Sequence, residues 1–340
     1  MTFDLNTTWF LLVGVLFSGY AILDGFDLGV GVLHLFTKKD LDRRIMLNSI
    51  GPVWDGNEVW LVTGGGALFA AFPDVYATSF SGFYLAFMLL LVALIFRAVA
   101  IEFRSKRESA RWRATWDVSF SVSSIVSSLL IGVALGNVAL GIPLTAGHEY
   151  TGGLIGLLRP LPLVVGLTTV ALFAMHGAIF VLMKTEGELH DMVRGWVPKL
   201  IGLFVAGYIL TTGLILAFVP HMTTLLFDYP ILFVVPALNV LAIANIPREI
   251  SRGNDFKAFL SSCVAMVLLM GLFGIGMYPD MIYSSPIAEN SLTIYNAASS
   301  AKTQQIMLII ALIGMPIVIA YTVSIYWIFR GKVKLDAHSY

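Results

Sequence analysis

Charged side chains inside apolar runs are the residues of this sequence most able to do chemistry. The first three such runs hold Asp24, Asp27, Asp55, Glu58 and Arg97. Each such group costs roughly 2.5–3.5 kcal/mol at the centre of a membrane helix, so the five cost on the order of 10–15 kcal/mol before pairing is considered. Four carboxylates and one guanidinium cannot all pair, so some carboxylates must be protonated, hydrated or paired with another chain. Groups of this kind suit proton transfer.

The spacing of these acids places them on shared helix faces. Asp24 and Asp27 are three residues apart, as are Asp55 and Glu58, and residues at this spacing are neighbours on a helix. A structural interpretation also stands, in which Arg97 pairs with Asp27 and Asp55 caps the start of its helix. A proton-carrying role for Asp55 or Asp24 and these structural roles both remain open from the residues alone.

Composition indicates which helices must position these groups. The chain has 340 residues, of which 58% are hydrophobic and 12% charged, with a mean hydropathy of +0.85. A soluble domain carries roughly a quarter charged residues, so this is an integral membrane protein. The net charge of zero argues against a nucleic-acid partner. The single cysteine, Cys263, excludes an intrachain disulfide, and the first residues lack the basic region of a cleaved signal peptide, so we expect the first apolar segment to be retained.

Nine apolar segments are long enough to cross a bilayer as helices. They lie near 9–36, 51–72, 78–103, 117–141, 161–184, 198–220, 229–246, 258–279 and 305–330. Each segment must satisfy its own backbone hydrogen bonds in lipid, which favours helices. We therefore predict an all-α integral membrane protein with nine transmembrane helices in a single transmembrane domain, residues 1–340.

The distribution of basic residues predicts the orientation in the membrane. Most of the 21 lysines and arginines fall in alternate connections and in the C-terminal tail. By the positive-inside rule, these connections are cytoplasmic, so the N-terminus is outside and the C-terminus inside. In this orientation the five membrane charges gather in the cytoplasmic half of the bilayer. Glycine pairs four residues apart, Gly25 with Gly29 and Gly132 with Gly136, predict close helix packing.

The histidines give little support for a metal or haem site in this chain. Only His176 lies well inside an apolar segment, whereas a bis-histidine haem site needs a second buried histidine. There is also no histidine pair at ligand spacing and no cysteine cluster. We predict that His176 is a packed, hydrogen-bonded core residue, and that the chain binds neither metal nor haem.

Several segments resemble subunit II of the cytochrome bd-type quinol oxidases. The N-terminal matches are Leu23–Gly31, Arg43–Ile50, Trp54–Trp60, Ala67–Pro73 and Phe80–Tyr84, continuing to Arg97. Later matches are Met175–Gly177, Lys184–Gly187 and Tyr295–Ser299. The resemblance covers nearly the whole chain and is most specific in the first hundred residues.

This resemblance implies two four-helix bundles plus one peripheral helix, in an obligate pair with a haem-bearing subunit I. Such a complex oxidises quinol and reduces dioxygen to water in a bacterial or archaeal cytoplasmic (inner) membrane, with protons taken from the cytoplasm. Haem b and haem d, or haem b alone, would belong to subunit I, as would the main catalytic residues. The resemblance also implies membrane lipid, a bound quinone and a small single-helix accessory subunit as further partners.

The resemblance also gives the charged residues roles. Asp55, Asp24 and Glu58 are expected on the proton pathway, surrounded by Asp27, Arg97, Trp54 and Asn57. A proton-coupled secondary transporter that uses the same acids is the main alternative, although the charges lie away from the midplane where such sites usually are. A quinone-binding membrane anchor of another redox complex is a third interpretation.

Overall fold

Two helices form the centre of the fold, α1 (Leu5–His34) and α7 (Pro160–Lys184). The computed structural model describes residues 4–335. A Cβ atom added to Gly29 of α1 would lie 1.8 Å from the carbonyl oxygen of Phe173 in α7, and one added to Gly177 would lie 2.5 Å from the carbonyl carbon of Gly29. The two backbones therefore touch, a close approach that only glycine permits.

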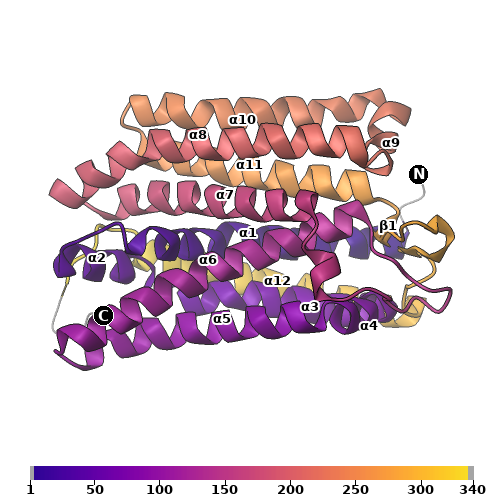
Figure 1. Cartoon of the computed structure of the whole chain (residues 1–340), viewed down its shortest axis with the longest axis horizontal. Helices are drawn as coiled ribbons and strands as arrows, with labels where there is room; N and C mark the ends of the chain where they lie inside the picture. The colour runs from indigo at the N-terminus through magenta and orange to yellow at the C-terminus, as the bar shows by residue number, and fades with distance from the viewer. Residues whose placement is uncertain (1–3, 336–340) are drawn as a thin grey trace.

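Two groups of long helices flank this central pair (Figure 1). On the α1 side lie α3 (Trp54–Ala71) and α6 (Ala110–Leu140), which pack on α1, and α5 (Tyr84–Phe103), which packs on α6. On the α7 side lie α8 (Gly187–Phe218) and α11 (Asp255–Met277), which pack on α7, and α10 (Val234–Ser251), which packs on α11. The last helix, α12 (Ala301–Ile328), contacts α1 and α3, and Gln304 is its only buried residue.

Short elements lie at the two ends of the long helices (Figure 1). The short helices are α2 (Asp40–Ile50), α4 (Pro73–Gly82) and α9 (His221–Asp228). Single 3-10 turns are η1 (Arg104–Lys106), η2 (Leu154–Leu157), η3 (Pro230–Phe233) and η4 (Ala288–Asn290). Strands β1 (Asp280–Ile282) and β2 (Leu292–Thr293) pair antiparallel at the end opposite α2. The sequence did not predict α2, because its polar residues resemble those of a connection.

Within residues 4–335, eight helices are long and apolar enough to cross a membrane. They correspond to eight of the nine predicted segments. The remaining segment, 51–72, forms α3, whose first turns contain Asp55, Asn57 and Glu58 and so lower its mean hydropathy. Phe72 then interrupts the helix before Pro73 begins α4. The prediction of an all-helical membrane protein is confirmed.

Helix ends and helix contacts follow local chemistry. The largest boundary differences are at the starts of α6 and α8. They begin at Ala110 and Gly187, well before their apolar segments, since their polar first turns extend beyond the apolar run. Ser109 stabilises the start of α6 by accepting a hydrogen bond from the backbone N–H of Trp112. The predicted packing of Gly132 is also confirmed, because a Cβ there would lie 2.7 Å from the Cα of Gly166.

Candidate functional site

The first part of the site is an ion pair buried between α1, α3 and α5. One nitrogen of the Arg97 guanidinium, Nη2, donates to Oδ1 of Asp24 at 2.7 Å and also to Oε1 of Glu58. Arg97 and Asp24 are fully buried, whereas the Glu58 side chain is 26% exposed. Oδ2 of Asp24 and the other two nitrogens of Arg97 have no hydrogen-bond partner in the described part of the chain. Asp24 therefore uses only one of its two carboxylate oxygens, and Arg97 only one of its three nitrogens, in hydrogen bonds.

The second part of the site is a row of three hydrogen-bonded side chains from α1, α3 and α12. Asn57 donates through its amide nitrogen to Oδ2 of Asp27 at 2.8 Å, and its amide oxygen accepts from the hydroxyl of Tyr326 at 2.9 Å. Asp27 and Asn57 are buried. Arg97 thus pairs with Asp24 and Glu58 rather than with Asp27, because the rotation of α1 turns Asp27 toward Asn57.

Asp55 lies outside this buried group, at the start of α3. Its side chain is exposed in the first turn, where a negative charge is favoured by the helix dipole. Val53 occupies the cap position and provides no side-chain hydrogen bond, so Asp55 does not cap the helix by hydrogen bonding. Trp54 is buried in the main apolar core.

One further buried polar group borders the site and was missed from the sequence. Tyr20 is one helical turn before Asp24 on α1 and is 4% exposed. Its hydroxyl has no hydrogen-bond partner among residues 4–335, yet it lies close enough to Asp24 for direct electrostatic interaction. A tyrosine at this spacing resembles ordinary core packing, so the sequence alone gave no signal for it.

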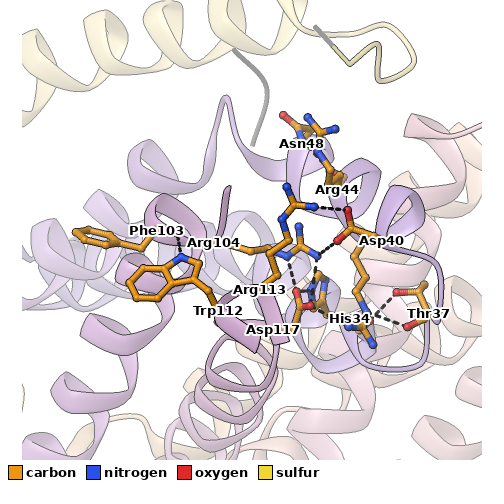
Figure 2. Close-up of polar contacts among 11 residues, drawn as sticks. His34, Thr37, Asp40, Arg44, Asn48, Phe103, Arg104, Trp112, Arg113 and Asp117 are labelled. Atoms are coloured by element: carbon orange, nitrogen blue, oxygen red, sulfur yellow. Dashed lines mark hydrogen bonds and ion pairs between the residues drawn. The ribbon is translucent and has the colours of Figure 1, made fainter. Parts of the chain in front are cut away.

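A second charged cluster, the α2-end cluster, lies near α2, which Figure 1 shows at one end of the long helices; Figure 2 shows its side chains. Its centre is Asp117 of α6, which is buried. Oδ1 of Asp117 contacts Nε2 of His34 at 2.6 Å and Nε of Arg104 at 2.5 Å. Oδ2 accepts from Arg43 at 2.8 Å and from Arg104 at 3.3 Å. Both oxygens of Asp117 are therefore saturated by protein donors.

The α2-end cluster continues toward the surface through Asp40. Arg104 donates to Oδ1 of Asp40 at 2.7 Å, and Arg113 donates to Oδ2 at 3.1 Å (Figure 2). A cavity of about 230 Å³ lies beside Asp40, Arg113 and Asp117. The cluster ties the ends of α1, α2, α5 and α6 together. Asp117 was missed because it is the first residue of a predicted segment, where a charge is unremarkable.

His176 is a packed, hydrogen-bonded core residue, as predicted. Its Nδ1 contacts the hydroxyl of Ser262 at 2.7 Å, and its Nε2 contacts the carbonyl oxygen of Ile22 at 3.0 Å. The ring is fully buried and stacks on Phe259 at 4.8 Å. Both ring nitrogens are already engaged, so His176 does not fit the role of an axial haem ligand. No group of three or more metal-ligating side chains occurs among residues 4–335.

The fold and the buried charges define the class as a multi-pass helical membrane protein with an acid cluster suited to proton transfer. Comparison with known proteins then specifies the family. The chain belongs to the family of cytochrome bd terminal oxidase subunit II, whose model matches residues 5–329. This family forms a quinol oxidase complex in which the chain is a subunit, and the transporter interpretation finds no support.

Individual relatives match over nearly their whole length. The chain is 38% identical to cytochrome bd-I ubiquinol oxidase subunit 2 of Escherichia coli K12, covering 98% of this chain and 96% of that one. It is 34% identical to cytochrome bd ubiquinol oxidase subunit 2 of Bacillus subtilis, covering 97% of each. The bd oxidase structure from Geobacillus thermodenitrificans shares the fold, with a TM-score of 0.79 at 17% identity over 96% of this chain and 98% of that chain.

Membership of the family has coarse consequences for location and partners. The chain is a multi-pass protein of the inner membrane and works in a complex with subunit I. The family's haems belong to that partner subunit. Both nitrogens of His176 are engaged by protein groups, and another fully buried histidine, His34, is held against Asp117.

Proposed function

We propose that this chain carries protons from the cytoplasmic side toward the oxygen-reducing haem site of subunit I. Asp55 collects protons at the surface, Glu58 and Asp24 pass them inward, and Arg97 holds these last two acids together. Asp27, Asn57 and Trp54 belong to the surroundings of this group. Subunit I supplies the haems, haem b with haem d or haem b alone, on which quinol electrons reach dioxygen.

A gradient of exposure along these acids is the observation that carries the proposal. Asp55 is exposed, the Glu58 side chain is 26% exposed, and Asp24 is fully buried. Asp55 and Glu58 lie about one turn apart on α3. Nη2 of Arg97 contacts both Glu58 and Asp24. A carboxylate with a free oxygen can accept a proton there without losing its existing hydrogen bond. The acids therefore form steps from the surface inward.

We also propose nine transmembrane helices with the N-terminus outside and the C-terminus in the cytoplasm. The ninth is α3, whose 18 residues span about 27 Å at 1.5 Å per residue, close to the roughly 30 Å of a hydrocarbon core. Basic residues gather at the α2 end, including Arg43, Arg104 and Arg113, which supports a cytoplasmic location for that end.

The helix contacts support an arrangement as two four-helix bundles with α12 peripheral. The first would contain α1, α3, α5 and α6, and the second α7, α8, α10 and α11, joined through contacts of α7 with both α1 and α6. Extensive apolar surface remains exposed on the outer helices, which suits membrane lipid, subunit I, a quinone and a small accessory helix as neighbours.

Substitution of Asp55 by asparagine in the intact complex tests the proton pathway. Asn keeps the size of the side chain but cannot carry a proton, so quinol-driven oxygen consumption should fall on the order of tenfold to a hundredfold. Haem content and assembly should be unchanged, because Asp55 is exposed and makes no capping hydrogen bond.

Asp74→Asn is the matched control, because Asp74 is also exposed in the first turn of a helix, α4, after the interruption at Phe72. It should leave oxygen consumption unchanged. Wild-type turnover in the Asp55→Asn complex would remove Asp55 from the pathway.

A further inference from the structure

The contact between α12 and the buried acids has no part in the proton pathway as described so far. Among the described residues of α12, only Gln304 is buried, and this residue contacts Trp9 and Asn6 near the start of the helix. Near the other end, Tyr326 packs against the main core and donates to Asn57. An otherwise peripheral helix therefore places one hydroxyl inside the site.

The hydrogen bonds of Asn57 fix the orientation of its amide. The amide nitrogen donates to the carbonyl oxygen of Leu23 at 3.2 Å and to Oδ2 of Asp27 at 2.8 Å. A carbonyl oxygen can only accept, so the NH₂ group must face Leu23. The amide oxygen then faces Tyr326, whose hydroxyl donates to it. With two bonds donated and one accepted, the amide has a partner on each side.

This orientation makes the two oxygens of Asp27 unequal. Oδ2 accepts from Asn57, whereas Oδ1 is buried and has no hydrogen-bond partner among residues 4–335. A proton on Oδ2 would compete with the N–H of Asn57, while a proton on Oδ1 would not. Oδ1 is therefore the atom at which Asp27 can gain and lose a proton without rearranging its neighbours.

We propose that Tyr326 is a positioning residue for proton transfer at Asp27, acting through Asn57 to hold Oδ2 as an acceptor and leave Oδ1 free. The proposal rests on the proton-carrying function proposed above and adds Asp27 to the groups that exchange protons. It also assigns α12 a role in the site, although this helix contributes no charge there.

The expected effect of losing the Tyr326 hydroxyl follows from the amide. Without the Tyr326 hydroxyl, the Asn57 amide is held only from its NH₂ side, so its hydrogen bond to Oδ2 of Asp27 weakens. A weaker donor stabilises the charged form of Asp27 less. The protonated acid would persist to higher pH. The charged and titratable groups around this pair are Asp24 of α1, Glu58 of α3, Arg97 of α5 and, near Tyr326, Cys263 of α11. None of them is altered by Tyr326→Phe.

The test is Tyr326→Phe in the complete oxidase complex, followed by infrared spectroscopy and by turnover against pH. The carbonyl band of protonated Asp27, identified by its loss in Asp27→Asn, should titrate about one pH unit higher in Tyr326→Phe. Quinol-driven turnover should fall about threefold to tenfold at neutral pH and recover toward alkaline pH. Tyr321→Phe, at an exposed position on the same helix, should change neither measurement.

Two results would overturn the positioning role. One is an Asp27 band that titrates identically in Tyr326→Phe and wild type. The other is a turnover loss that is the same at every pH, as expected of a purely structural defect. Failure of the underlying proton pathway is distinguishable, because Asp55→Asn would then turn over normally whatever the Asp27 band does.

Discussion

The two buried charged clusters differ in how fully their carboxylates are satisfied. In the α2-end cluster, Asp117 receives four contacts from three side chains, and both of its oxygens have donors. Around Arg97, Asp24 and Asp27 each have one oxygen with a donor and one without. Asp24, Asp27 and Asp117 are equally buried, so burial does not distinguish the two clusters. They differ in the number of carboxylate oxygens that have no hydrogen-bond donor.

This difference indicates a structural role for the α2-end cluster and a capacity for proton exchange in the acids around Arg97. A saturated carboxylate surrounded by arginines is held in its charged form, since protonation would break several charge-assisted bonds. A carboxylate with a free oxygen can be protonated while its other bond persists. Acids also outnumber cations around Arg97, where Asp24, Asp27 and Glu58 surround one guanidinium.

The largest effect should follow from Asp117→Ala. This change leaves Arg104 buried without its main partner, and breaking a buried pair in this way costs about 3–5 kcal/mol. We expect a large fall in the thermal stability and yield of the complex, measured by thermal unfolding of purified material. Glu108→Ala, an exposed residue beside the same cavity, is the control. A stable Asp117→Ala complex would show that saturation does not indicate a structural role.

Asp24→Asn should have a smaller effect on stability and a clear one on turnover. The amide oxygen can still accept from Arg97, so the complex should assemble, but the side chain can no longer carry a proton. We expect quinol-driven oxygen consumption to fall about tenfold, equivalent to about 1.4 kcal/mol in the barrier. Normal turnover with a loss of stability as large as that of Asp117→Ala would show that Asp24 has the same structural role as Asp117.

The smallest effect concerns Asp280, a half-buried carboxylate in β1 at the opposite end of the molecule. Burial raises its pKa to about 6, and among residues 4–335 no ion pair offsets this. Because the folded-state pKa lies above the unfolded value, the contribution of Asp280 to stability is greatest at low pH and is lost as pH rises through 6. Asp280→Asn should therefore raise the melting temperature slightly at pH 7 and leave it unchanged at pH 4. Parallel melting curves for the two proteins across this range would contradict the assignment.

The sequence predicted the burial of Asp24, Asp27 and Arg97 but not how they pair. The cost of burying Asp24, Asp27 and Arg97 can be read from composition and hydropathy, which do not depend on tertiary contacts. The partner of Arg97 could not be read in this way. Asp24 and Asp27 share one face of α1, so the rotation of that helix about its axis decides which acid meets Arg97.

For the fold, too, features set by local sequence were predictable, whereas features set by contacts between distant residues were not. Apolar runs predicted the long helices, and the glycine pairs predicted their close contacts. The short helix α2 was not predicted, because its polar residues gave no apolar run to mark it. Tyr326 was missed for a related reason, since a tyrosine near the end of a membrane helix is typical of the bilayer interface. Its role depends on Asn57, which is far away in the sequence.

The placement of Tyr326 on the last helix has a consequence for biogenesis. A membrane chain is inserted from its N-terminus, so α1, α3 and α5 can bring Asp27, Asn57 and Arg97 together before α12 is made. Until α12 docks, the oxygen of the Asn57 amide lacks its donor and Asp27 lacks its fixed orientation. Under the positioning role proposed for Tyr326, the acid group therefore reaches its final geometry only after α12 has docked.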